Sequence, residues 1–202
     1  MIKLENELRQ VKSVAIAGHV RPDGDCTGSC LAVYNYIREH FPAVKAAVYL
    51  ETVNPSFAML YRSEEIQTEC AGDERYDLFL ALDVSDKERM GAAAKYFETA
   101  GRRVCIDHHI TNQGFADEDW IEPDASSTSE LVFKSMEEDK ISKETAEALY
   151  MGIIHDTGIF QYSNTTQETM EIAGKLMAKG IAFSRIIDET FYQKTYIQNQ
   201  VL

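Results

Sequence analysis

The sequence predicts an α/β fold with a mostly parallel β-sheet that is flanked by helices on both faces. Two observations predict it: short, nearly continuous apolar runs of strand length, and helical patterns between and after these runs. Strands that are apolar without alternation are typical of a sheet buried on both faces, and alternating strands and helices favour parallel pairing. Ligands of such sheets bind outside the carboxyl ends of the strands.

The individual elements follow from local patterns. The expected strands, each partly β-branched or aromatic as strands are, are the runs 14–17, 46–50, 77–83 and 103–107. The expected helices are 27–40, 86–100, 127–139, 143–155 and 167–179. The segment "SSTSE" (126–130) starts the third of them, with Ser127 or Thr128 as the N-cap. Gly158 is expected to stop the fourth, and no repeat or low-complexity linker divides residues 1–185, which we expect to form one domain.

Composition excludes several classes of function. The formal net charge of −13 disfavours binding of long duplex nucleic acid, because proteins that hold long strands carry basic patches. A short phosphorylated ligand held through metal ions stays possible. No apolar run approaches the roughly 20 residues of a membrane span, and the charged start "MIKLENELRQVK" is unlike a signal peptide. The sequence therefore predicts a cytoplasmic protein with no membrane partner.

The cysteines do not indicate a metal knuckle. A cysteine zinc site usually needs two closely spaced pairs. The chain has four cysteines, and they do not form two such pairs. Reduced thiols are the default without a secretion signal. Cys26 and Cys30 are accordingly expected to be small buried residues.

Aspartate and histidine collect where the expected strands and one helix end. The residues are His19, Asp23, Asp25, Asp83, Asp107, His108, His109 and Asp156. Because parallel strands end at the same edge of a sheet, we expect these side chains to meet there. Massed carboxylates repel one another, and divalent cations remove the repulsion. Imidazole and carboxylate donors without thiolate suit Mn²⁺, Mg²⁺ or Fe²⁺, so the pattern indicates a dinuclear metal site.

Each of these residues alone has a simpler interpretation. Asp23 lies between Pro22 and Gly24 in a turn-like tripeptide, where aspartate bonds its own backbone. Asp83 could cap a helix that starts near Ser85, and Asp156 could mark a helix end. Only the coincidence of all of them at one sheet edge favours a metal site.

Four segments resemble the successive motifs of the DHH phosphoesterases, a family named for Asp-His-His. They are "HVRPDGDCTGS", "LALDVSD", "CIDHHITN" and "GIIHDTGIF". The connecting segments, including "GFADEDWIEPDASSTSELVF", resemble the NrnA-like branch of nanoRNases and pAp phosphatases. The resemblance runs in order from about residue 8 to 195.

The resemblance implies a role for each motif residue. It assigns His19 and Asp23 to a first metal ion, Asp25, His108 and Asp156 to a second, and Asp83 to both. It makes Asp107 a residue that orients its neighbours and places His109 against the substrate phosphoryl group. Asp83, Asp107, His108 and His109 are thus the expected catalytic residues, with two Mn²⁺ ions favoured over Mg²⁺ or Fe²⁺. Weaker candidates for substrate contacts are Arg21, Ser127, Thr128 and His155.

The resemblance also implies an activity. The expected reactions are hydrolysis of short oligoribonucleotides to 5′-mononucleotides and of 3′-phosphoadenosine 5′-phosphate (pAp) to AMP by a two-metal mechanism. A linear dinucleotide would fit the same pocket. The alternatives are a manganese-dependent pyrophosphatase, a cyclic or linear dinucleotide phosphodiesterase, and an inactive metal-binding interaction module. Some family members form homodimers, which makes a homodimer possible here.

Family members carry a second, smaller domain with a glycine-rich substrate-binding loop. These 202 residues contain no such loop. Residues 186–202, including "FYQKTYIQNQVL", are expected to be the helical start of the linker to that domain.

Overall fold

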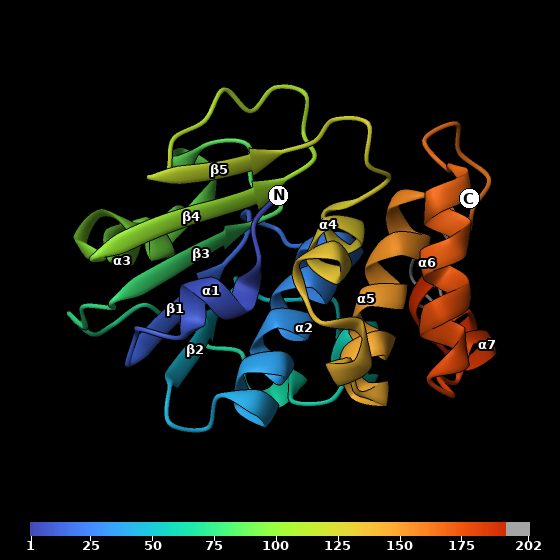
Figure 1. Cartoon of the computed structure of the whole chain (residues 1–202), viewed down its shortest axis with the longest axis horizontal. Helices are drawn as coiled ribbons and strands as arrows, with labels where there is room; N and C mark the ends of the chain where they lie inside the picture. Colours follow the sequence, from blue (N-terminus) through green and yellow to red (C-terminus); the bar gives the residue numbers. More distant parts are fainter. Residues whose placement is uncertain (193–202) are drawn as a thin grey trace, which may run out of the picture.

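The computed structural model describes residues 1–192 and contains a five-stranded, all-parallel sheet with strand order β2-β1-β3-β4-β5 (Figure 1). The strands are β1 (Ser13–Ala17), β2 (Lys45–Tyr49), β3 (Leu78–Leu82), β4 (Arg102–Asp107) and β5 (Glu118–Ile121). In register, Ala17 pairs with Ala81, and Leu82 pairs with Ile106. The carboxyl ends of β1, β3 and β4 therefore lie side by side, and the predicted fold class is confirmed.

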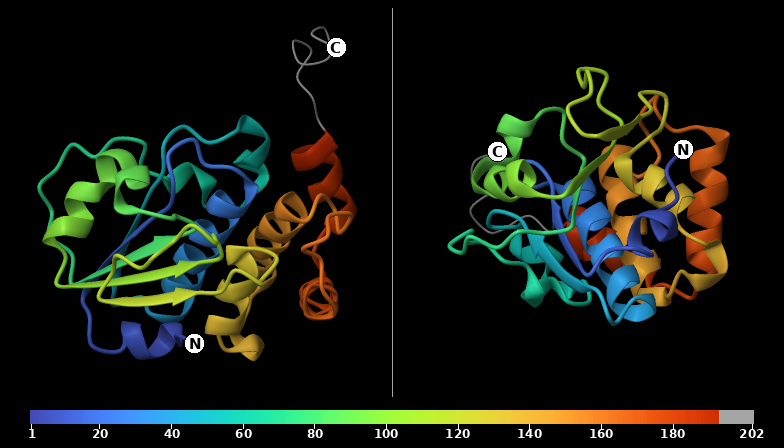
Figure 2. Two further views of the ribbon diagram at one scale, coloured as in Figure 1. Left: turned by 90° about the horizontal axis from the view of Figure 1, so that it is seen from above. Right: turned by 60° about the vertical axis from the view of Figure 1, so that its left-hand side comes forward.

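Helices cover both faces of the sheet. They are α1 (Leu4–Leu8), α2 (Gly24–His40), α3 (Ala94–Thr99), α4 (Thr128–Ser135), α5 (Lys143–Asp156), α6 (Gln167–Ala178) and α7 (Phe183–Ile186). Side chains of α1, α2, α4 and α5 share one core cluster with one face of the sheet, and side chains of α3 pack on the other face. Helix α6 packs outside α5, farther from the sheet (Figure 2).

The two-sided burial explains why the strands have continuous apolar sequences. Successive side chains of a strand point to opposite faces. In β1, Val14 and Ile16 join the cluster with α2, α4 and α5, whereas Ala15 and Ala17 join the cluster with α3. A strand in this position has no solvent-facing side, so no polar alternation marks it.

The edge strand β5 is a difference from the sequence prediction. In its segment "EDWI", Glu118 and Asp119 are exposed, Trp120 is buried and Ile121 is half-buried. An edge strand with one solvated face has no continuous apolar run. The pattern search for buried strands therefore missed it.

Two predicted helices are shorter than expected. Segment 86–100 is a 3₁₀ segment, Lys87–Ala93, followed by α3, because Gly91 has a φ of 57° and interrupts the helical backbone. Helix α4 ends at Ser135, ahead of 139. Its N-cap is Ser127, whose hydroxyl accepts a hydrogen bond from the Glu130 N–H, as predicted.

The segment after α6 contains two short helical pieces. Helix α7 is followed by a π-helical segment, Ile187–Tyr192. The expected linker helix, 186–202, lies outside the described residues from position 193 onward. Within residues 1–192, no helix combines the length and the apolar character needed to cross a membrane.

Helices α2 and α5 approach each other closely at Gly28. A Cβ at this position would lie 2.5 Å from the Ala148 carbonyl oxygen and 3.0 Å from the Gly152 nitrogen. Because backbone atoms cannot yield without separating the helices, we expect Gly28→Ala to lower the free energy of unfolding by about 1–3 kcal/mol. Gly174→Ala in α6 is the matched control, since nothing lies within 4 Å of its Cβ position; it should stabilise by up to about 1 kcal/mol. Urea unfolding of both variants checks this, and an unchanged Gly28→Ala protein would contradict it.

Candidate metal centre

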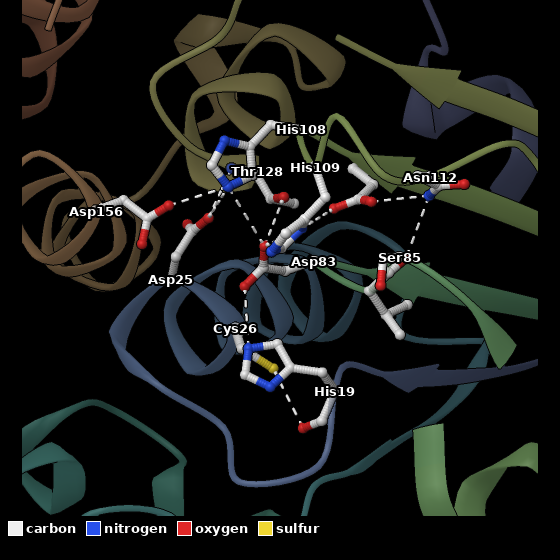
Figure 3. Close-up of polar contacts among 12 residues, drawn as sticks. His19, Asp25, Cys26, Asp83, Ser85, His108, His109, Asn112, Thr128 and Asp156 are labelled. Carbon is white, nitrogen blue, oxygen red and sulfur yellow. Dashed lines mark hydrogen bonds and ion pairs between the residues drawn. The ribbon is translucent and has the colours of Figure 1, made fainter. Parts of the chain in front are cut away.

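The motif residues converge at the carboxyl edge of the sheet, as the sequence predicts. They come from the loop after β1 (His19), the first turn of α2 (Asp25), the position after β3 (Asp83), the loop after β4 (His108) and the last residue of α5 (Asp156) (Figure 3). Possible ligand atoms lie within 4.8 Å of one another in three groups: Asp25, His108 and Asp156; Asp83, His108 and His109; and His19, Cys26 and Asp83.

Asp83 occupies the centre of this arrangement. One carboxylate oxygen, Oδ2, lies 3.5 Å from His19 Nε2, and the other, Oδ1, lies 3.7 Å from His108 Nε2. Its backbone φ is +55°, a left-handed conformation that aspartate adopts more readily than most residues. The chain therefore turns directly after β3 and places one carboxylate between two histidines.

Both histidines direct Nε2 toward these carboxylates. His19 Nδ1 lies 2.8 Å from the Val20 carbonyl oxygen, and His108 Nδ1 lies 3.3 Å from the Ala125 carbonyl oxygen. A carbonyl only accepts, so Nδ1 carries the hydrogen, and Nε2 of the neutral ring carries a lone pair. A lone pair that faces a carboxylate is repelled unless a proton or a cation lies between them. Ring orientation by a backbone carbonyl is the usual arrangement of metal-binding histidines.

The pKa values show how strongly the site favours positive charge. Burial lowers the pKa of His108, but Asp156 at 3.0 Å and the charges of Asp25 and Asp83 outweigh it and raise the pKa to about 10. In the same way, Asp23 and Asp83 raise the pKa of His19 against the effect of its burial. Burial, followed by the charges of Asp83 and Asp156, raises the pKa of Asp25. Divalent cations would satisfy all of these groups together, so the residues present fit a metal centre.

Asp25 is held by the start of α4. It is completely buried; its Oδ2 accepts the Thr128 N–H at 2.6 Å, and its Oδ1 accepts the Ser129 N–H at 2.9 Å. A helix N-terminus favours an anion because its first N–H groups have no partner within the helix. The anion bound at this helix start is thus a carboxylate of the chain itself.

This arrangement changes the interpretation of Ser127 and Thr128. Both residues are fully buried, and the Thr128 hydroxyl donates to Asp83 Oδ1 at 3.1 Å. Thr128 therefore orients Asp25 and Asp83, and Ser127 caps α4, so both buried residues have a place that differs from the expected contact with substrate. The sequence pattern identified the cap at Ser127 but could not show that Asp25 fills the helix start.

Asp107 orients His109 and is itself held by Asn112. The buried Asp107 accepts the His109 Nδ1–H at 2.7 Å on Oδ1 and the Asn112 Nδ2–H at 2.8 Å on Oδ2. Burial raises the pKa of Asp107, but these two donors outweigh it and lower the pKa. The His109 side chain is 41% exposed, so part of it is open to a ligand. Asn112 was not predicted; its position in "DHHITN" is the only signal.

The loop before α2 places Asp23 and Arg21 near the opening of the site. Asp23 is the N-cap of α2 and lies 3.6 Å, Oδ2 to Nε2, from His19. Arg21 has a φ of +55°, and its N–H donates to Glu51 Oε2 at 2.9 Å. Its side chain borders a hollow of about 480 Å³ that Pro22, Glu51, Thr52 and Thr68 also line.

His155 packs among aromatic side chains. Its ring lies edge-on to Phe57 and Phe191, at centroid distances of 5.3 and 5.4 Å, and its Nε2 lies 3.1 Å from Thr190 Oγ1. Burial lowers its pKa. The His155 ring also packs against Gly24, at the start of α2.

The sheet is all parallel, and carboxylates and imidazoles that could hold metal ions converge at its carboxyl edge. Residues 13–153 match the family model described as "DHH family, N-terminal domain", and the chain belongs to that family. The resemblance expected from the four motifs is confirmed.

Several named proteins are similar to this chain over most of its length. The bifunctional oligoribonuclease and PAP phosphatase NrnA of Bacillus subtilis (strain 168) is 29% identical over 189 residues, covering 90% of this chain and 58% of its own length. The protein of the same name from Thermus thermophilus is 28% identical over 178 residues, covering 87% and 52%. The crystal structure of an exopolyphosphatase-related protein from Bacteroides fragilis superposes with a TM-score of 0.89 at 26% identity, covering 98% of this chain and 61% of that one. The chain spans less than two thirds of each.

Proposed function

We propose that residues 1–185 form the catalytic domain of a metal-dependent phosphoesterase that hydrolyses short oligoribonucleotides to 5′-mononucleotides and pAp to AMP. The observation that carries the proposal is Asp83, whose two oxygens face the Nε2 atoms of His19 and His108 from either side. The names of the similar bacterial proteins support this substrate class.

The proposed ligands follow this geometry. His19 and Asp23 would hold a first ion, Asp25, His108 and Asp156 a second, and Asp83 both. Carboxylate and imidazole donors suit Mn²⁺, with Mg²⁺ or Fe²⁺ as alternatives. When bound, such ions supply positive charge to the phosphoryl oxygens and activate water.

His109, Asp107 and Asn112 would position the substrate and move a proton. Because Asp107 fixes the Nδ1–H of this partly exposed His109 ring, Nε2 is the nitrogen that can hold a proton near a phosphoryl or leaving oxygen. Asn112 donates to the other oxygen of Asp107 and keeps it from turning. In this proposal, Asp107 and Asn112 are positioning residues, and His109 is the catalytic residue that contacts substrate.

Arg21 is the proposed contact for a second phosphate. Within residues 1–192, its guanidinium forms no ion pair, and it borders the hollow beside the His19 loop. pAp and short oligonucleotides carry a further phosphate that such a group can bind. The net charge of −13 agrees with short substrates, which need few phosphate contacts.

Chromatography of reaction products tests the proposal. An equal mixture of pApA, pAp and pyrophosphate is incubated with the protein and Mn²⁺, with Asp83→Asn as the control. We expect release of AMP that the control lacks. Phosphate from pyrophosphate alone would favour a pyrophosphatase instead, and no product from any of the three would contradict the proposed activity of these residues.

A further inference from the structure

The buried thiol of Cys26 borders the first of the two proposed metal positions. Its Sγ, a ring nitrogen of His19 and a carboxylate oxygen of Asp83 lie within 4.8 Å of one another, and all three residues are buried (Figure 3). Two ligands of one ion, each bound at about 2.0–2.3 Å, lie at most about 4.6 Å apart. The three donors are therefore close enough together to share an ion after small adjustments.

The local structure explains why the thiol reaches this place. Cys26 lies in the first turn of α2, and its N–H donates to the N-cap carboxylate of Asp23 at 3.0 Å. The absence of a side chain at Gly18 leaves space for the sulfur atom, since a Cβ at that position would fall 2.2 Å from Cys26 Sγ. The Cys26 thiol donates to the His19 carbonyl oxygen at 3.8 Å.

Cys26 makes the two proposed metal positions chemically different. Around His108, the possible donors are carboxylates and imidazoles only, whereas the group around His19 adds a sulfur atom. Thiolate favours Zn²⁺ and similar softer ions, and carboxylate favours Mn²⁺ and Mg²⁺. A coordinating thiol loses its proton to the solvent when the ion binds, even where burial has kept it neutral.

We propose that Cys26 is a further ligand of the first ion, together with His19, Asp23 and Asp83. Imidazole, carboxylate and thiolate are the donor types that Zn²⁺ binds in proteins. The first position then takes a Zn²⁺-class ion, and the second position takes Mn²⁺ or Mg²⁺. This inference rests on the metal site of the proposed function and goes beyond it in the choice of ion.

Cobalt spectroscopy on the full chain tests the role of Cys26. We expect metal-free protein titrated with Co²⁺ to develop visible ligand-field bands together with a near-ultraviolet thiolate-to-cobalt charge-transfer band. Cys26→Ala should lose the charge-transfer band, keep the visible bands, and bind Zn²⁺ at least about tenfold more weakly. Cys30→Ala is the matched control, because Cys30 is an equally buried cysteine one turn further along α2 and belongs to none of the ligand groups; it should keep both sets of bands.

The outcomes separate this inference from the proposed function. Cys26→Ser keeps nearly the same side-chain volume and provides the same test if Cys26→Ala does not fold. Two results would overturn the role of Cys26 and leave the metal site in place. One is a parent protein that shows the visible bands without a charge-transfer band. The other is a charge-transfer band that persists in Cys26→Ala as it does in Cys30→Ala. Absence of any Co²⁺ bands, with no heat of binding for Mn²⁺ or Zn²⁺, would overturn the metal site itself.

Discussion

Asp83→Asn is expected to lower phosphoesterase activity more than about 100-fold while the protein stays folded. Loss of a group that only supports a ligand costs about 10–100-fold, and among residues 1–192 Asp83 is the one carboxylate within 4 Å of both His19 and His108. Asparagine tolerates the φ of +55°, and its carbonyl can still accept the Thr128 hydroxyl. Its amide nitrogen, however, cannot bind a cation. The measurement is kcat/KM for pAp in Mn²⁺, together with thermal unfolding monitored by circular dichroism.

Two further variants delimit this result. Asp107→Ala, which removes the carboxylate that holds His109, should also remove activity and leave the fold largely intact. Asp73→Asn changes an exposed carboxylate in the segment that leads into β3, at the other edge of the sheet, and should retain full activity. Near-normal turnover of Asp83→Asn in Mn²⁺ would contradict the shared-ligand assignment.

Removal of divalent ions is expected to abolish activity completely and to lower the melting temperature, and added Mn²⁺ should restore both. Asp25 and Asp83 are buried together, and their repulsion contributes to the raised pKa of Asp25. An ion that binds only the folded chain relieves this repulsion and stabilises the protein by about 2.7 kcal/mol at a concentration 100 times its Kd. Calorimetric scans with a chelator and with Mn²⁺ provide the measurement.

The same scans on Asp83→Asn serve as the control. Since this variant lacks the carboxylate proposed to hold both ions, Mn²⁺ should shift its melting temperature less than it shifts that of the parent protein. A parent protein with the same melting temperature and activity in chelator as in Mn²⁺ would show that no divalent ion takes part.

The sequence predicted most of the elements that carry the site. The strands β1, β3 and β4 have continuous apolar runs because both faces of the sheet are covered. Strand β5 escaped prediction because Glu118 and Asp119 are exposed at the sheet edge, so the strand has no continuous apolar run. The break at Gly91 escaped as well, because a positive φ at one glycine leaves no mark on the helical pattern around it.

The sequence alone determined the class of fold and the chemical types of the candidate ligands, because apolar runs and donor atoms are local properties of a chain. Only the tertiary structure decided what each donor faces. It joined Asp25 to the start of α4 across 103 positions, directed the two oxygens of Asp83 to different histidines, and brought the Cys26 thiol beside His19 and Asp83. Such contacts depend on how helices pack against the sheet edge, and a local pattern contains no information about that packing.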